Sequence, residues 1–90
     1  MSKVHVDPAE LRRFATDLTR FNNDLAGLMQ SLNARLRGLE ATWRDQEQKK
    51  FSDAFEATSK ALAHFLDASR EHAAFLAKKA AIVEEYQRQR

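Results

Sequence analysis

Residues 11–32 read LRRFATDLTRFNNDLAGLMQSL, and their large apolar side chains recur at alternating intervals of three and four residues. This spacing places them along one side of an α-helix, as in the seam of a helical bundle. The predicted seam residues are Leu11, Phe14, Leu18, Phe21, Leu25, Leu28 and Leu32. The pattern therefore predicts a long amphipathic helix that packs against at least one other helix.

The residues just before this stretch have the features of a helix start. Asp7 can accept hydrogen bonds from the free amides of a first turn, and Pro8 suits the first helical position because its missing amide would lack a partner there. Glu10 completes a capping box. We therefore expect the first helix to begin at about residue 8.

The apolar stripe continues to Trp43, where the pattern breaks, and Asp45 with Gln48 forms a second, weaker capping box. Steps of four and three then resume without glycine or proline. The second seam is Phe51, Phe55, Thr58, Leu62, Phe65, Ser69, His72, Leu76, Lys79, Val83 and Tyr86. The sequence predicts an all-α fold in one domain, residues 1–90, as an antiparallel hairpin with helices at about 8–40 and 46–87 and a turn at about 41–45.

Within this hairpin, the first-helix seam is expected to pack on Phe55, Leu62, Phe65 and Leu76 of the second helix. The second helix also has two flanks of apolar or small residues. One flank is Ala54, Ala61, Ala68, Phe75 and Ile82, and the other is Ser52, Ser59, Leu66, Ala73 and Ala80. A stripe this wide exceeds what one partner helix covers, so we expect a second hairpin to meet the flanks and form a four-helix bundle.

Some positions of the second seam carry polar residues. Among them, Ser69, His72 and Lys79 stand where a stable core favours leucine. Polar seam residues can fix register and oligomeric state at a cost in stability. We expect instead that they are partly exposed near an open end of the bundle.

The composition excludes several classes of protein. The 90 residues are 43% hydrophobic and 31% charged, with no cysteine, which excludes a two-domain enzyme, a disulfide framework and a thiolate zinc site. Fifteen basic and thirteen acidic residues are interleaved along the chain. Since nucleic-acid binders gather their cations, we expect no nucleic-acid partner. The first twenty residues lack the apolar run of a signal peptide, and no membrane insertion is expected.

Catalytic and cofactor motifs are also missing from the sequence. The carboxylates are scattered, and there is neither a serine elbow nor a glycine-rich phosphate loop. His64 and His72 lie about 12 Å apart along a helix, too far to hold one metal ion. We therefore expect a non-enzymatic protein without cofactor or metal.

These features together resemble the WXG family, whose members are small helical hairpins exported by type VII secretion systems. The resemblance rests on the two amphipathic helices, the Val6-Asp7-Pro8 start, the mid-chain Trp43 and the spacing from Trp43 to Phe51. It implies a bacterial protein that forms a homodimer, or a heterodimer with a related hairpin. It further implies secretion from the cytoplasm without a cleaved signal peptide, with a type VII-like export ATPase or a larger effector as further partners.

Two positions differ from the motifs of that family. Trp43-Arg44-Asp45 stands where the family has tryptophan-x-glycine, and an aspartate can both adopt turn geometry and cap the second helix. The family's export signal ends in a tyrosine followed four positions later by an acidic residue, whereas Tyr86 is followed by Arg90. The chain thus resembles a divergent branch, which either uses a different export route or relies on the tail of its partner.

Two elements are candidate docking sites. Trp43 is expected to fill the end of the bundle beside the turn, with docking of a secretion component as the alternative. Because Asp7 lies opposite about residue 80, the tail residues Ile82, Val83 and Tyr86 are expected to project past the hairpin, unless a long dimer buries them. The alternative function is an intracellular coiled-coil adaptor that pairs with another helical protein and is not exported.

Overall fold

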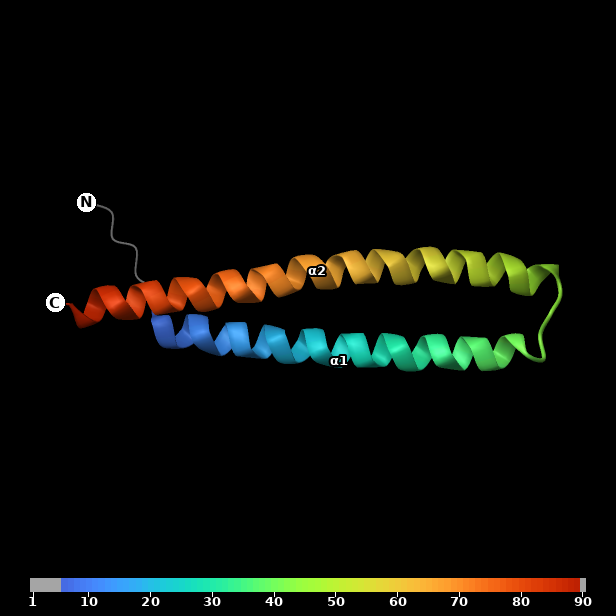
Figure 1. The fold of residues 1–90 in the computed structure, drawn as a ribbon, viewed down its shortest axis with the longest axis horizontal. Coiled ribbons are helices and arrows are strands. Elements are labelled where there is room, and N and C mark those ends of the chain that lie inside the picture. The colour runs from blue at the N-terminus through green and yellow to red at the C-terminus, as the bar shows by residue number, and fades with distance from the viewer. Residues whose placement is uncertain (1–5, 90) are drawn as a thin grey trace.

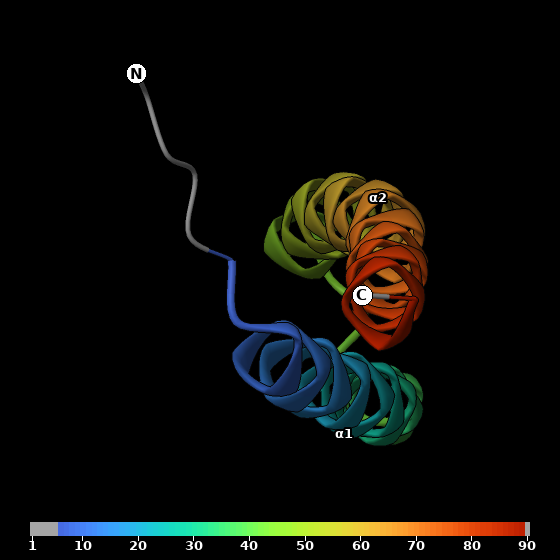
Figure 2. The ribbon, with the colours of Figure 1, turned by 90° about the vertical axis from the view of Figure 1, so that its left-hand side faces the viewer.

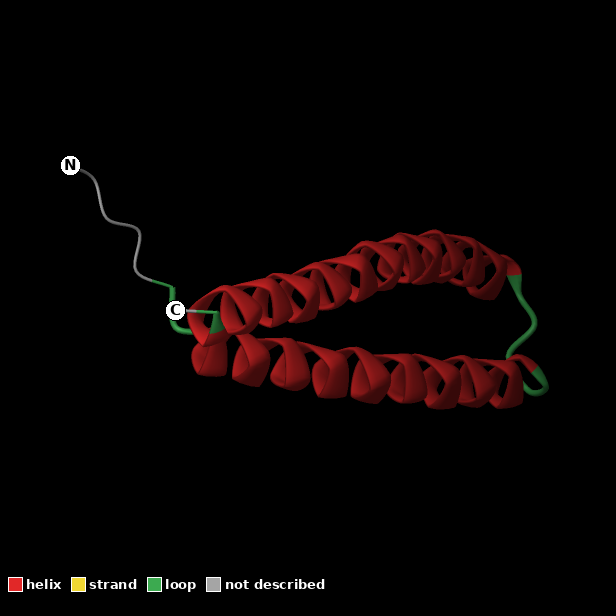
Figure 3. Cartoon of the chain, turned by 60° about the vertical axis from the view of Figure 1, so that its left-hand side comes forward, coloured by secondary structure: helices red, strands yellow, loops and turns green. Residues whose placement is uncertain are grey.

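The computed structural model describes residues 6–89, which form an antiparallel hairpin of two α-helices (Figure 1). Helix α1 spans Pro8–Glu40 and helix α2 spans Gln46–Arg88. The molecule measures 68 × 24 × 13 Å. The predicted all-α hairpin is confirmed: within the described residues, helices are joined by one short connection (Figure 3).

Both helices begin at an aspartate cap. The amide of Ala9 donates to the Asp7 carboxylate at 2.9 Å, and the amide of Gln48 donates to the Asp45 carboxylate at 2.9 Å. Between the helices, the amides of Thr42 and Trp43 donate to the Leu39 carbonyl at 3.1 and 3.0 Å, which closes the last turn of α1. These short-range bonds satisfy backbone groups that a helix end leaves free.

Replacing Asp45 with alanine is expected to lower the free energy of unfolding by about 1 kcal/mol, because α2 loses the acceptor at its first turn. Chemical denaturation followed by circular dichroism measures this change. Asp67→Ala is the matched control, since Asp67 is exposed in the middle of α2, and a change within about 0.5 kcal/mol is expected. Equal losses in the two variants would contradict a capping role.

The interface between α1 and α2 contains little apolar surface. In the described part of the chain, the buried apolar residues are Ala15, Leu66, Ala73 and Ala80, and the buried polar residues are Asn22 and Ser69. Alanine allows the two helices to approach closely but contributes little apolar area. Seen end-on, the helices lie side by side in a single layer and wind gently about each other (Figure 2).

The predicted packing of the two seams holds only in part: the Phe21 and Phe65 rings meet across the helix boundary, but many large seam side chains stay exposed. The exposed residues of the predicted first-helix seam are Phe14, Phe21, Leu28 and Leu32, and those of the second are Phe51, Leu62 and Phe65. Half-buried seam residues are Leu11, Leu18, Leu25, Phe55 and Leu76. The face of α2 that meets α1 is instead the predicted outer flank from Ser52 to Ala80, because its small side chains permit the closer approach.

Hydrogen bonds between side chains link the helices at intervals along their length. Ser59 donates to Asn33 at 3.3 Å and Ser69 donates to Asn22 at 2.7 Å, while nearer the turn Ser52 donates to Glu40. Ser69 is 3% exposed, so the expectation of partial exposure is wrong for this residue. His72 and Lys79 are exposed, as expected. The polar pairs fix the register of one helix against the other.

Candidate protein interaction surfaces

One side of the hairpin carries large apolar side chains from both helices. Phe14, Phe21 and Phe65 each immediately precede a residue buried between the helices, so each points sideways, about 100° from the interface. Because α1 and α2 run antiparallel, the residue just before an interface residue points to the same side of the hairpin in both helices. The rings of Phe21 and Phe65 meet edge to face, with centroids 6.4 Å apart, which places them together across the helix boundary.

We call this side the apolar face. Its residues are Phe14, Phe21, Leu28, Leu32, Leu39, Phe51, Leu62 and Phe65, which are 36–67% exposed. Soluble monomers rarely expose contiguous apolar surface of this kind, which usually marks a contact with another protein. The apolar face is thus the strongest candidate interaction surface on the described part of the molecule.

An aromatic cluster extends the apolar face to the turn. The ring of Trp43 lies 6.1 Å from that of Phe51, which stacks on Phe55 at 5.8 Å. Trp43 is half-buried. Its indole therefore packs against the first turns of α2 while part of the ring stays accessible. Asp45, the other predicted turn-motif residue, acts as the cap of α2.

The tail of α2 projects less far than the sequence predicts. Tyr86 and Ile82 are 68% and 56% exposed, but Val83 is half-buried. The reason is Glu84, whose carboxylate accepts two hydrogen bonds from the Arg12 guanidinium, at 2.7 and 3.0 Å. This pair joins the end of α2 to the start of α1, so the free part of the tail begins after Glu84. Arg90 lies outside the described residues.

A family model described as proteins of 100 residues with WXG matches residues 3–87. The chain belongs to the WXG100 family. Members of this family are non-enzymatic helical proteins, the family suggests secretion, and its proteins generally pair with related hairpins. The resemblance inferred from Trp43 and the two amphipathic helices is thereby confirmed. The comparisons with curated proteins and with solved structures give no match.

The described residues of this WXG100 protein offer no metal centre, since no three His, Asp or Glu side chains gather where they can hold an ion. Neither of its two helices is long and apolar enough to cross a membrane.

The Arg12–Glu84 pair makes the attachment of the α2 tail depend on pH. Hydrogen bonds from Arg12 lower the pKa of Glu84 below its ordinary value of 4.5. A carboxylate whose pKa is lowered by folding stabilises the folded state above its unfolded pKa, and this contribution is lost as the pH falls through the folded pKa. Glu84→Gln is expected to reduce hydrogen-exchange protection at the end of α2 at neutral pH, and this difference from the unmodified WXG100 protein should vanish at acidic pH.

The matched control for this WXG100 protein is Glu85→Gln. Glu85 pairs with Arg88 within α2 and makes no hydrogen bond or ion pair to α1 in the described structure. Its replacement should leave the attachment of α2 to α1 unchanged. Equal loss of protection in both variants, or a difference that persists at acidic pH, would contradict the assigned role of Glu84.

Proposed function

We propose that this protein is a non-enzymatic export substrate, or the export partner of a larger effector, in a type VII-type secretion system, and that it acts as a dimer. The observation that carries the proposal is the apolar face. The described hairpin exposes eight large apolar side chains there, while its interior holds one leucine and three alanines as buried apolar residues. A second hairpin placed on this face removes these side chains from water, which is the main driving force for association of proteins.

The leucines of α1 support a second copy of the same chain as the partner. Leu11 and Leu39 lie equally far from Leu25 in the sequence, as do Leu18 and Leu32. A two-fold axis at Leu25, perpendicular to α1, therefore brings Leu11 opposite Leu39 and Leu18 opposite Leu32 in an antiparallel dimer. The same axis brings Tyr86 of one protomer toward the turn end of the other. A related hairpin with the same spacing gives an equivalent heterodimer.

In this proposal the dimer leaves the cytoplasm without a cleaved signal peptide, and its docking elements are Trp43, Ile82, Val83 and Tyr86. Ile82 and Tyr86 are exposed, and Val83 is half-buried. These side chains offer an apolar contact to an export ATPase or to a larger effector. The family to which the chain belongs supports this role.

Two measurements test the proposal. Sedimentation velocity at micromolar concentration should give about twice the chain mass of 10.3 kDa, and a compact, stable monomer would contradict the dimer. In the native host, a tagged chain should accumulate in the culture medium, and Tyr86→Ala should abolish this accumulation. Gln87→Ala is the matched control, because Gln87 is the exposed neighbour in α2.

Retention of the protein inside cells, with no effect of Tyr86→Ala on its location, would favour the alternative function. That alternative is an intracellular coiled-coil adaptor, which uses the same apolar face to pair with another helical protein. Arg90 stands where the family's export signal has an acidic residue, and this difference favours the alternative function.

A further inference from the structure

A cation stands in the apolar row of α1. The row repeats every seven residues at Phe14, Phe21 and Leu28, and the next position of the repeat is Arg35. Arg35 immediately precedes the half-buried Leu36, just as Phe14 precedes a buried residue, so it points to the same side of the hairpin. The residue is exposed and makes no ion pair within residues 6–89.

The dimer proposed above places the Arg35 guanidinium beneath a second hairpin. A charge that is taken out of water costs free energy unless an opposite charge meets it. A dimer formed through the apolar face therefore requires a carboxylate close to Arg35. The two-fold axis at Leu25 determines where on the other protomer that carboxylate has to lie.

This axis brings Arg35 of one protomer to the level of Ala15 in the other, because each residue lies ten positions from Leu25. Side chains of an α-helix lean toward its N-terminus. In the antiparallel α1 of the partner this direction runs from the level of Ala15 toward that of Asp17, about 3 Å along the axis. Asp17 follows Phe14 by three residues, so it lies beside that ring at the outer edge of the apolar face.

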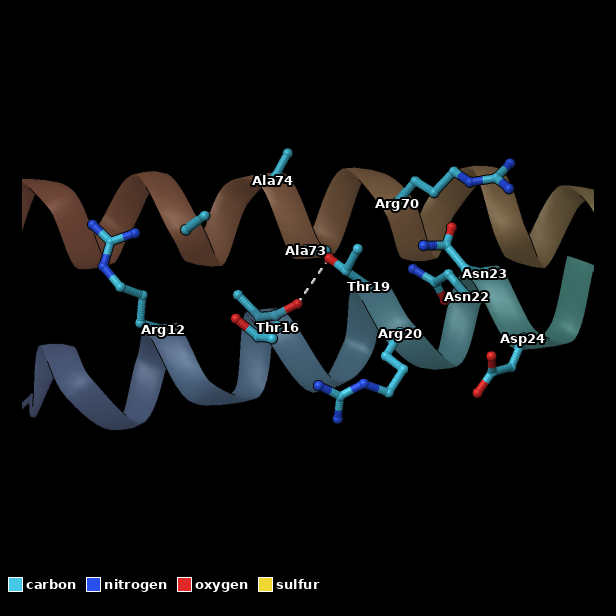
Figure 4. Close-up of a pocket in the computed structure, with 12 residues that line it drawn as sticks. Arg12, Thr16, Thr19, Arg20, Asn22, Asn23, Asp24, Arg70, Ala73 and Ala74 are labelled. Carbon is cyan, nitrogen blue, oxygen red and sulfur yellow. Dashed lines mark hydrogen bonds between the residues drawn. The ribbon is translucent and has the colours of Figure 1, made fainter.

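Asp17 is placed to receive a second cation. Its side chain is 61% exposed and lies 3.6 Å from Arg20, which is directed away from α2 (Figure 4). An exposed pair at this distance contributes little to stability, and a carboxylate can accept two parallel hydrogen bonds from a guanidinium. We propose that Arg35 of each protomer pairs with Asp17 of the other, and that these two ion pairs fix the antiparallel register of the dimer.

The occupant of the apolar face is then a second copy of this chain, which supplies both the cation and the carboxylate. The proposed pairs depend on the dimer of the proposed function and add to it the residues that select the partner. They also separate two arrangements of the dimer. A two-fold axis parallel to the helices stacks α1 of one protomer on α2 of the other, and Arg35 then does not meet Asp17.

An exchange of charges tests the proposal by sedimentation equilibrium of the full chain. Arg35→Glu brings two carboxylates together at both contacts, and Asp17→Lys brings two cations together. Each variant alone is therefore expected to self-associate about tenfold or more weakly than the unmodified chain. An equimolar mixture of the two variants restores opposite charges at both contacts. We expect the mixture to associate about as strongly as the unmodified chain, and native mass spectrometry to find one copy of each variant in its dimer.

The matched controls are Arg37→Glu and Glu10→Lys. Arg37 follows the half-buried Leu36 and so points to the side of the hairpin opposite the apolar face. Glu10 lies seven residues before Asp17 in the same row, about 10 Å farther along α1 and beyond the reach of Arg35. Both variants should associate as the unmodified chain does.

Three results would overturn the proposed pairs while the dimer itself stands. One is a mixture that associates no better than either variant alone, another is a control that weakens association as much as Arg35→Glu, and the third is unchanged association of Arg35→Glu or Asp17→Lys. The last result would indicate another register or a related hairpin as the natural partner. A monomeric unmodified chain would overturn the dimer and the pairs together.

Discussion

Replacing both Phe21 and Phe65 with glutamate is expected to convert the proposed dimer into a monomer. The two rings are 50% and 49% exposed and touch each other at the centre of the apolar face. Burying one phenylalanine contributes about 1.5–3 kcal/mol, and a symmetric dimer loses four rings and gains four carboxylates. We therefore expect association to weaken by at least about a thousandfold, measured by sedimentation equilibrium.

The matched control is Phe75→Glu. Phe75 is 66% exposed, but it follows the buried Ala73 by two residues and so points away from α1, outside the apolar face. This variant should keep the dimer. Loss of the dimer in the control, or an unchanged association constant in the double variant, would show that the contact between protomers lies elsewhere.

Leu66→Ala is expected to cause the largest loss of stability within one hairpin. Leu66 is 5% exposed and is the one large aliphatic side chain buried between the described helices. Truncation of a buried leucine typically costs about 2–5 kcal/mol, through the lost transfer free energy and the cavity left behind. Chemical denaturation should show this loss at every protein concentration, since the contact lies inside one chain.

Leu28→Ala is the corresponding change on the apolar face, where Leu28 is 67% exposed. If a second hairpin covers this residue, its truncation should destabilise the protein only at concentrations at which the dimer forms. Two results would contradict the division between hairpin interior and apolar face. One is a loss of stability in Leu28→Ala that does not depend on protein concentration, and the other is a loss in Leu66→Ala that does.

The helices and their starts could be predicted from sequence because local interactions determine them. Asp7, Pro8 and Asp45 act within one turn of their own helix, and apolar spacing over thirty residues leaves little alternative to an amphipathic helix. The presence of a turn near Trp43 follows for the same reason.

The face that each helix turns to the other could not be assigned in this way. Periodicity identifies the residues that share one side of a helix, but it does not say which partner covers that side. The available signal was the repeat every seven positions in α2, where Ser52, Ser59, Ala73 and Ala80 are small and allow close approach on either side of Leu66. The pairs of Asn22 with Ser69 and Arg12 with Glu84 depend on the alignment of two helices and have no local signature.

The polar pairs between α1 and α2 determine how the hairpin responds to pulling. When the helices separate, Ser59 and Asn33 exchange one hydrogen bond for others to water, and the same holds for Ser52 and Glu40. Because each such exchange changes the free energy only slightly, α1 and α2 can separate progressively from one end, one hydrogen-bonded pair at a time. Resistance to mechanical unfolding should therefore come mainly from the partner that covers the phenylalanines and leucines of the apolar face.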